Sequence, residues 1–345
     1  IDYPGRVQAV ERFNEENPVL KKGIAMMPIK FGISFNMPAL NQAGALVHVY
    51  TDGSVHLNHG GTEMGQGLFV KVAQVVATEF QIDIDNIKIS STRTDKVPNT
   101  SATAASSGSD LNGMAAYDAT NKIKTRMTRV AAGHFGVAPE EIEFRQNRVY
   151  AGNESLSFAE AAQMTWEQRE SLSATGYYQT PDIHWDPITC TGSPFYYFSY
   201  GVAVSEVVID TLTGENRILR ADILHDAGAS LNPALDIGQI EGGYVQGAGW
   251  LTTEELVWDA KGTLKTHAPS TYKIPAISDR PDVFNVALWD EPNPAQTIYR
   301  SKAVGEPPLM LGISAFMALS DAVSACGDGF GDLQTPATAE AVLTA

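Results

Sequence analysis

Four glycines fall within the eight residues Gly60–Gly67, and this cluster constrains the fold more than any other segment. It lies between an apolar, strand-like run ending at His59 and a stretch from Leu68 whose apolar residues repeat with helical spacing. Glycines at such a junction let backbone amides approach a ligand, and the N-terminus of the following helix favours an anionic group. A tight connection that needs positive φ angles explains the cluster equally well. The segment has neither the Gly-Lys-Ser/Thr of a P-loop nor the acidic residue of a dinucleotide-binding fingerprint.

A second segment, Asn99–Ser109, is rich in hydroxyl groups and small side chains and precedes a helical pattern that extends to about His134. Such a loop offers many hydrogen-bond donors with little bulk, which suits a phosphate or a polar ring system. Its alanines Ala104 and Ala105 leave room for a planar substrate. The alternative is an ordinary polar surface loop followed by a helix capped at Ser109.

Glu306 stands between Gly305 and two prolines, Pro307 and Pro308. Prolines fix the backbone and are tolerated in a first helical turn, so Glu306 is expected at the start of the apolar helix Leu309–Ala325. Burial at that position would make the carboxylate a better general base, whereas the helix dipole opposes this change. The alternative is a glutamate that only caps the helix.

Strand and helix patterns mix along the rest of the chain. Asp52-Gly53 between two apolar runs predicts a hairpin, and the turn Leu212–Asn216 between residues 195–209 and 217–226 predicts a long antiparallel pair. Leu256–Leu264 suggests a further hairpin. Because strands and helices do not alternate regularly, the pattern favours an α+β fold of mixed sheets with packed helices over a doubly wound sheet.

The composition indicates a folded protein with an acidic surface. Lys and Arg number 24 against 40 Asp and Glu, which gives a net charge of −16, and 43% of the residues are hydrophobic. This charge argues against nucleic-acid or anionic-membrane partners, which need a basic footprint. We see no run of eighteen apolar residues and expect no membrane span. The two cysteines, Cys190 and Cys326, are too few for a disulfide framework or a metal-ligand set, and a reduced, cytoplasmic protein is expected.

Other polar residues are weaker candidates. His56 and His59 are three positions apart on a strand, so they point to opposite faces and are poor co-ligands. His225 and Asp226 could form a pair, although a polar contact at a strand end is the simpler interpretation. Gln239, on a helix interrupted by glycines, faces either a ligand or a satisfied core network.

These motifs, taken together and in order, resemble the C-terminal part of the molybdenum-binding subunit of the xanthine dehydrogenase family. The likeness starts at about Lys22 and covers nearly all of the remaining chain. It implies a fold of the molybdenum cofactor-binding domain type with two linked lobes. The segments that carry it are 31–35, 60–67, 103–106, 236–239, 269–275 and 302–308.

The resemblance also implies an organisation of the chain. We expect residues 1–21 to be a polar N-terminal segment of a truncated subunit. Residues 22–194 would form a molybdopterin-binding lobe with the Gly-rich and Ser/Thr/Ala loops. Residues 195–345 would form a second lobe that carries Gln239 and the catalytic Glu306.

Roles for individual residues follow from the same resemblance. Glu306 matches the general base that deprotonates the Mo–OH group, and no side chain of this chain is expected to ligate the metal. Phe35 matches an aromatic that meets the purine edge-on; Asn36 follows it where the family usually has threonine. Ala104 and Ala105 also border the substrate. Contacts with the molybdopterin cofactor are implied for Met64, Gly65, Gln66, Thr103, Ala104, Ala105, Ser106, Ser107 and Gln239.

The implied reaction is hydroxylation of hypoxanthine or xanthine to urate with water as the oxygen source. Glu306 would remove the Mo–OH proton, the oxygen would attack an electron-poor purine carbon, and hydride would pass to the Mo=S sulfur. Electrons would leave through two 2Fe-2S clusters to FAD and NAD in a companion polypeptide.

The expected partners are a purine substrate, the upstream half of the same subunit and an FAD/iron-sulfur subunit, in a hetero-oligomer. In the family the upstream half carries a first Gly-rich cofactor loop, a further aromatic, and the Glu and Arg that orient the purine. We therefore expect this chain alone to be inactive and to present a concave apolar surface where that half docks.

Two alternatives stay open. The chain could belong to a related molybdenum hydroxylase acting on aldehydes or other N-heterocycles, although residues 31–35 and 269–275 favour the xanthine branch. It could also be a non-catalytic structural lobe that holds partner subunits. The presence of Gln66, Gln239 and Glu306 together argues against a purely structural lobe.

Overall fold

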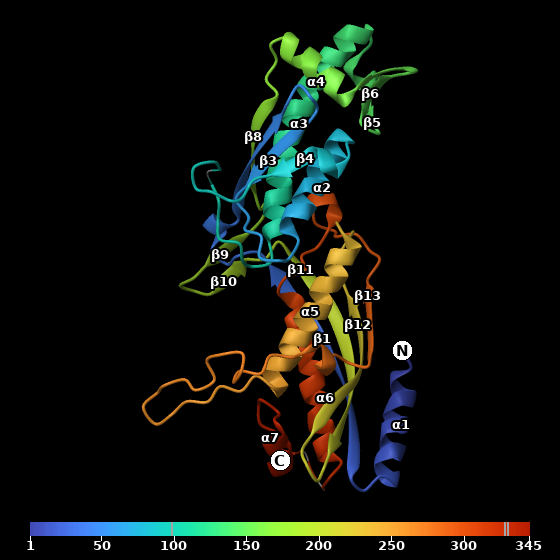
Figure 1. Cartoon of the computed structure of the whole chain (residues 1–345), viewed down its shortest axis with the longest axis vertical. Helices are drawn as coiled ribbons and strands as arrows, with labels where there is room; N and C mark the ends of the chain where they lie inside the picture. The colour runs from blue at the N-terminus through green and yellow to red at the C-terminus, as the bar shows by residue number, and fades with distance from the viewer. Residues whose placement is uncertain (98, 328, 330) are drawn as a thin grey trace.

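Two four-stranded sheets, one in each of two lobes, organise the computed structural model, which describes residues 1–97, 99–327, 329 and 331–345. The lobes are stacked along the long axis of the molecule (Figure 1). The strand order of the lower sheet is β1 (Leu20–Ile33), β11 (Tyr197–Asp210), β12 (Asn216–His225), β13 (Val283–Leu288). The strand order of the upper sheet is β4 (Ile87–Ile89), β3 (Val55–His59), β2 (Gln42–Val49), β8 (Ser173–Gln179).

Helices cover both faces of the lower sheet. A Cβ atom on Gly23 of β1 would overlap the carbonyl oxygen of Ala318, so this position lets a helix backbone approach the sheet closely. The next residue, Ile24, points to the other face and packs with Val10 near the N-terminus. The helices of the first face are α5 (Pro233–Thr252), η6 (Pro307–Gly312) and α6 (Ile313–Ser324). On the opposite face lies α1 (Tyr3–Glu16), and α7 (Ala339–Thr344) closes the lower end (Figure 1).

The segment Pro307–Ser324 is long and apolar enough by composition to cross a membrane, although polar residues such as Asp321 interrupt it. In the structure most of it is buried, and α6 packs as a core helix against β1 and β11.

The upper lobe is built around α3 (Gly108–Phe135), which packs against β2 and β8. Gly176 of β8 allows this contact, because a Cβ atom there would overlap the carbonyl oxygen of Ala115. Helix α2 (Leu68–Phe80) packs beside α3, and its apolar residues Val72, Val76 and Phe80 join the upper core.

Smaller elements complete the structure. The upper end holds β5 (Ile142–Arg145), β6 (Arg148–Ala151), β7 (Glu154–Ser157) and α4 (Phe158–Glu167). Where the lobes meet lies the hairpin β9 (His184–Asp186) and β10 (Thr191–Ser193). Single 3-10 turns are η1 (Pro38–Leu40), η2 (Ile84–Asn86), η3 (Pro139–Glu141), η4 (Ile277–Asp279) and η5 (Ile298–Arg300).

The upper lobe is inserted between two neighbouring strands of the lower sheet. β1 and β11 pair antiparallel from Leu20 with Asp210 to Ile33 with Tyr197. The sequence-based division had placed residues 22–33 with the first lobe, whereas the structure pairs them with the second. Local patterns could not reveal this, because the two strands are far apart in the chain.

The mixed α+β architecture is confirmed, since β13 is parallel to β12 and β4 to β3 while the other pairs are antiparallel. The hairpin at Asp52-Gly53 and the long pair around 212–216 are also present. The hairpin expected at Leu256–Leu264 is present as a short one without assigned strands. An antiparallel bridge joins Trp258 and Leu264, and the amides of Lys265 and Asp259 donate to the carbonyls of Val257 at 2.7 Å and Thr263 at 3.0 Å. It lies in an arm that extends away from the body after α5 (Figure 1).

Candidate functional site

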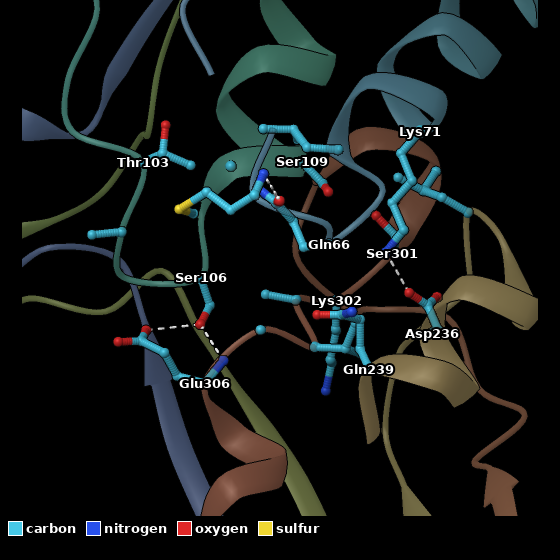
Figure 2. Close-up of a pocket in the computed structure, with 18 residues that line it drawn as sticks. Gln66, Lys71, Thr103, Ser106, Ser109, Asp236, Gln239, Ser301, Lys302 and Glu306 are labelled. Atoms are coloured by element: carbon cyan, nitrogen blue, oxygen red, sulfur yellow. Dashed lines mark hydrogen bonds and ion pairs between the residues drawn. The ribbon is translucent and has the colours of Figure 1, made fainter. Parts of the chain in front are cut away.

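A cavity of about 410 Å³ lies where the two lobes meet (Figure 2). Its lining comes from segments 64–71 and 103–109 of the upper lobe and from segments 231–239 and 301–306 of the lower lobe. The two loops singled out in the sequence therefore meet in space, and Gln239 and Glu306 join them.

Most of the residues assigned to the site by resemblance lie in this lining, but five do not. Those in the lining are Met64, Gln66, Thr103, Ala104, Ser106, Gln239 and Glu306. Those outside it are Phe35, Asn36, Gly65, Ala105 and Ser107. Phe35 is half-buried, and its backbone is held by Asn41, whose side chain binds the Phe35 amide at 2.8 Å and its carbonyl at 2.9 Å.

The Gly-rich loop supplies its own anion. The carboxylate of Glu63 accepts hydrogen bonds from the amides of Gly65 at 2.9 Å, Gly67 at 3.0 Å and Phe69 at 2.9 Å. Burial favours the protonated acid, but these amides outweigh it and lower the pKa of Glu63. The anionic group favoured at the N-terminus of α2 is thus provided in this structure by Glu63 of the loop itself.

Hydrogen bonds brace the first loop and join it to the second. The Gln66 side chain accepts from the Met64 amide at 2.5 Å and donates to the Thr62 carbonyl at 2.8 Å. The Thr62 amide donates to the Thr103 hydroxyl at 2.9 Å, 41 positions along the chain. Gln66 thus supports its own loop, and Thr103 ties the two loops together.

His59 supports the start of the same loop. The Gly61 amide donates to His59 Nδ1 at 3.1 Å and to the Asn112 side-chain oxygen at 3.0 Å. Burial lowers the pKa of His59 to about 4, although nearby Glu63 opposes this shift. The imidazole is therefore neutral at pH 7 and accepts the amide hydrogen at Nδ1.

The N-terminus of α3 opens into the cavity without a side-chain cap. Its N-cap residue, Ser107, makes no capping hydrogen bond, contrary to the expected cap at Ser109. Gly108 and Ser109 in the first turn line the cavity. Uncapped amides and the positive end of a helix dipole favour a negatively charged group at this point.

The Gln239 carboxamide is also free to bind a ligand. It lies on α5 and lines the cavity. Within the part of the chain that the structure describes, its side chain has no hydrogen-bond partner. It can therefore offer two donors and an acceptor to a polar ring.

Two buried lysines in the cavity wall are each paired with an aspartate. Lys71 of α2 binds Asp236 of α5, and their side chains are only 8% and 2% exposed. Lys302 binds Asp226 and donates to the Phe198 carbonyl at 3.0 Å. The first pair joins the two lobes directly, and in each pair the lysine and aspartate charges offset each other.

A buried hydrogen-bond chain reaches the Glu306 segment from α3. The Ala303 amide donates to the Tyr197 hydroxyl at 2.8 Å, which donates to Asp110 at 2.7 Å. Burial raises the pKa of Asp110 to about 7, although Tyr197 and Lys71 act in the opposite direction. Burial also raises the pKa of Tyr197, as does the neighbouring Asp110.

Glu306 is exposed at the edge of the cavity, so the burial that would make its carboxylate a better general base is not present in this structure. It is the N-cap residue of η6, yet its side chain makes no capping hydrogen bond, so the capping interpretation is not realised. Instead, the Ser106 hydroxyl donates to Glu306 Oε2 at 2.7 Å (Figure 2).

Sequence reasoning assigned no role to several residues that the structure places at the site, namely Glu63, Lys71, Asp110, Asp236 and Lys302. Lys71 carried a usable signal. It falls on the apolar face of the predicted helix between Leu68 and Val75, where an unpaired lysine is costly. The identity of its partner gives no comparable signal, because Asp236 lies 165 positions away.

Known proteins with similar chains support the same picture. The chain is 47% identical to a xanthine dehydrogenase of Dictyostelium discoideum over 99% of its length, and 48% identical to a xanthine dehydrogenase/oxidase of Felis catus over 99%. It covers 24% and 25% of those relatives, so it spans about a quarter of their length.

A solved structure with the same fold and a matching family model agree with this similarity to xanthine dehydrogenases. A CO dehydrogenase from Oligotropha carboxidovorans superposes with a TM-score of 0.84 at 23% identity, over 99% of this chain and 43% of that one. Residues 1–281 match the molybdopterin cofactor-binding domain family. This chain, with its two loops meeting at an inter-lobe cavity, belongs to the molybdopterin cofactor-binding domain family.

Proposed function

We propose that the chain is the C-terminal part of the molybdenum-binding subunit of a xanthine dehydrogenase, which hydroxylates hypoxanthine and xanthine to urate with water as the oxygen source. The observation that carries this proposal is the Glu306 carboxylate, exposed at the edge of a cavity that both loops line. The identity of 47–48% to proteins named xanthine dehydrogenase supports the purine as substrate.

The residues of the cavity fit a molybdopterin cofactor. The uncapped N-terminus of α3 suits an anionic phosphate, and the free Gln239 carboxamide suits the hydrogen-bonding edge of a pterin. Ser109 adds a hydroxyl in the same wall. The balanced pairs Lys71–Asp236 and Lys302–Asp226 leave the helix N-terminus as the source of positive potential.

When bound, the cofactor supplies the two-electron redox chemistry of the hydroxylation. The chain supplies the proton acceptor, since the Glu306 carboxylate faces solvent and has an oxygen free to take a proton. Ala104 keeps one wall of the cavity small, which leaves space for a planar ring. Met64 and Leu68 provide apolar contact beside it.

The test is Glu306→Gln in the complete enzyme. Glutamine keeps the size of the side chain and can still accept the Ser106 hydrogen bond, but it cannot take up a proton. We expect xanthine turnover to fall by about 10²–10⁴-fold with molybdenum content and folding retained. Turnover is measured with xanthine, and molybdenum by elemental analysis of the same preparation.

Glu291→Gln is the matched control, because Glu291 is exposed and lies outside the cavity lining. It should leave turnover unchanged. A fully active Glu306→Gln enzyme would remove Glu306 from the chemistry. An enzyme that oxidises an aldehyde series faster than purines would instead place the chain with the aldehyde hydroxylases.

The partners belong to the same proposal. Because the chain spans about a quarter of its relatives, the upstream half of the subunit and the FAD and 2Fe-2S centres would lie in other parts of a larger assembly. A hetero-oligomer of molybdenum-binding and FAD/iron-sulfur subunits is the arrangement we propose. Co-purification of the intact assembly with stoichiometric molybdenum, iron and flavin tests it.

A further inference from the structure

Ser106 and Glu306 make a two-way contact across the junction of the lobes. The Ser106 hydroxyl donates to Glu306 Oε2 at 2.7 Å, and the Glu306 amide donates to the same hydroxyl oxygen at 2.8 Å (Figure 2). The two residues are 200 positions apart. One hydroxyl therefore binds both the main chain and the side chain of Glu306, which fixes the direction of the carboxylate relative to its backbone.

Because a serine hydroxyl can donate only one hydrogen bond, this contact leaves Ser106 with no donor for another partner. A hydroxyl has one proton to donate, and Ser106 gives it to Oε2. It then has no proton left for a ligand in the cavity. Among the described residues Glu306 Oε1 has no hydrogen-bond partner, so it is the oxygen left to accept a proton.

The backbone around Ser106 is shaped for this contact. Ala105 and Ser106 have φ angles of 54° and 55°, a left-handed conformation that residues other than glycine rarely adopt, and here it occurs twice in succession. The turn is held by the Ser107 amide and hydroxyl, both of which donate to the Ala104 carbonyl, at 3.4 and 3.3 Å. Such conformations persist where the surrounding structure requires them, often at functional sites.

The backbone on either side of Glu306 is also held by contacts that do not involve Ser106, whereas the carboxylate depends on Ser106 for its position. The Ala303 amide is bound by Tyr197, and Pro307 and Pro308 are buried. The Glu306 side chain itself is exposed. In the described part of the chain Ser106 is its one hydrogen-bonding side-chain partner, and without it the carboxylate is free to change rotamer.

We propose that Ser106 is the positioning residue of the general base, acting through Glu306 rather than by binding the cofactor. This inference rests on the proposed function, in which Glu306 accepts the proton. Ser106 lies on the upper lobe and Glu306 on the lower lobe. The carboxylate is therefore held in its present direction only when the two lobes are in contact.

The test combines Ser106→Ala and Ser106→Gly with Glu306→Gln in the complete enzyme. Both Ser106 variants delete the hydroxyl, but glycine also relieves the left-handed backbone. We expect each to lower kcat by about 10-fold to 10²-fold with KM and molybdenum content unchanged, because a misplaced catalytic group costs rate of this order. In the Glu306→Gln background, Ser106→Ala should have no further effect.

A crystal structure of Ser106→Ala gives a readout that does not depend on activity. We expect the Glu306 carboxylate to leave its present position or to occupy more than one rotamer. Ser101→Ala is the control, because Ser101 lies in the same polar segment and, among the described residues, its hydroxyl bonds only to the Gln42 carbonyl, at 3.4 Å. It should change neither kcat nor the position of Glu306.

Three outcomes would overturn the proposal. Loss of molybdenum in Ser106→Ala with Glu306 still in place would make Ser106 a cofactor contact. Effects of Ser106→Ala and Glu306→Gln that multiply would show independent roles, and different losses in the alanine and glycine variants would point to backbone strain. If Glu306→Gln alone is fully active, the proposed function fails, while the crystal structure still decides whether Ser106 holds the carboxylate.

Discussion

Asp110 couples the fold to pH at the scale of a single side chain. Burial in the first turn of α3 raises the pKa of this carboxyl group to about 7, from about 3.8 in the unfolded chain. Between these values the protein takes up a proton on folding, so the contribution of Asp110 to stability is present below pH 4 and lost as the pH rises to 7. A shift of this size corresponds to about 4 kcal/mol.

Asp110→Asn should remove this pH dependence, because asparagine still accepts the Tyr197 hydrogen bond but cannot ionise. Relative to the parent chain, the variant should gain about 2–4 kcal/mol of unfolding free energy between pH 4 and pH 8. Urea unfolding at both pH values measures the gain. Asp290→Asn, at an exposed position, is the control and should show no such change. A difference between Asp110→Asn and parent that is the same at both pH values would contradict this expectation.

The contact between α5 and η6 shows how packing of elements sets the position of Glu306. A Cβ atom on Gly247 of α5 would overlap the carbonyl oxygen of Leu309, so the helix can approach the η6 backbone only with glycine at this position. η6 begins directly after Glu306. At least one of the glycines in the predicted helix, Gly247, is therefore needed so that α5 can pack against η6.

Gly247→Ala should lower the unfolding free energy by about 1–3 kcal/mol, because the two backbones must move apart. Chemical denaturation measures the loss. Gly242→Ala on the same helix is the matched control, since nothing lies within 4 Å of the added Cβ atom. It should be neutral or stabilise the protein by about 0.5–1 kcal/mol through helix propensity. Equal effects of the two substitutions would rule out the packing explanation.

At the scale of single elements, the sequence predicted those helices and turns that depend on residues close together in the chain. The helix from Leu68 and the turn at Leu212–Asn216 follow from periodicity and turn chemistry, and both are present. At Leu256–Leu264 the turn itself also forms, since the Asp259 carbonyl accepts the Gly262 amide at 2.9 Å. Its exposed flanks, however, have no sheet to pack on, so the hairpin does not extend into full strands beyond the Trp258–Leu264 bridge.

For the site, too, the sequence predicted the local segments but not the contacts between distant residues. Its two loops and Glu306 are marked by local composition, and the structure brings them to one cavity. The contacts between lobes were not predictable, because Lys71 with Asp236 and Ser106 with Glu306 join positions 165 and 200 residues apart. Nor could local reasoning show that the Glu63 carboxylate accepts the amides at the N-terminus of α2.

For the whole molecule, the buried Lys71–Asp236 pair should govern how firmly the lobes are joined. Lys71→Met leaves Asp236, 2% exposed, as a buried charge with Ser230 as its remaining side-chain partner. We expect a loss of about 3–5 kcal/mol in unfolding free energy, most of it recovered in Lys71→Met/Asp236→Leu. Denaturant unfolding of the single and double variants measures both values.

The exposed pair Lys122–Asp118 is the control, and Lys122→Met should cost less than about 1 kcal/mol. A Lys71→Met protein as stable as its parent would mean that water or a rearranged side chain compensates Asp236. The lobe contact would then rest on the other bridges, among them Tyr299 with Glu79, whose oxygens are 2.7 Å apart.

The insertion of the upper lobe between β1 and β11 has a consequence for how the chain acquires its structure. Residues 34–196 form a loop between two strands that must pair along their whole length, and closing so long a loop costs roughly 4–5 kcal/mol of chain entropy. If the upper lobe folds first, it brings Ile33 and Tyr197 together, and the lower sheet then closes as an ordinary hairpin. The chain is thus suited to ordered assembly, in which the lobe synthesised in the middle templates the sheet made by both ends.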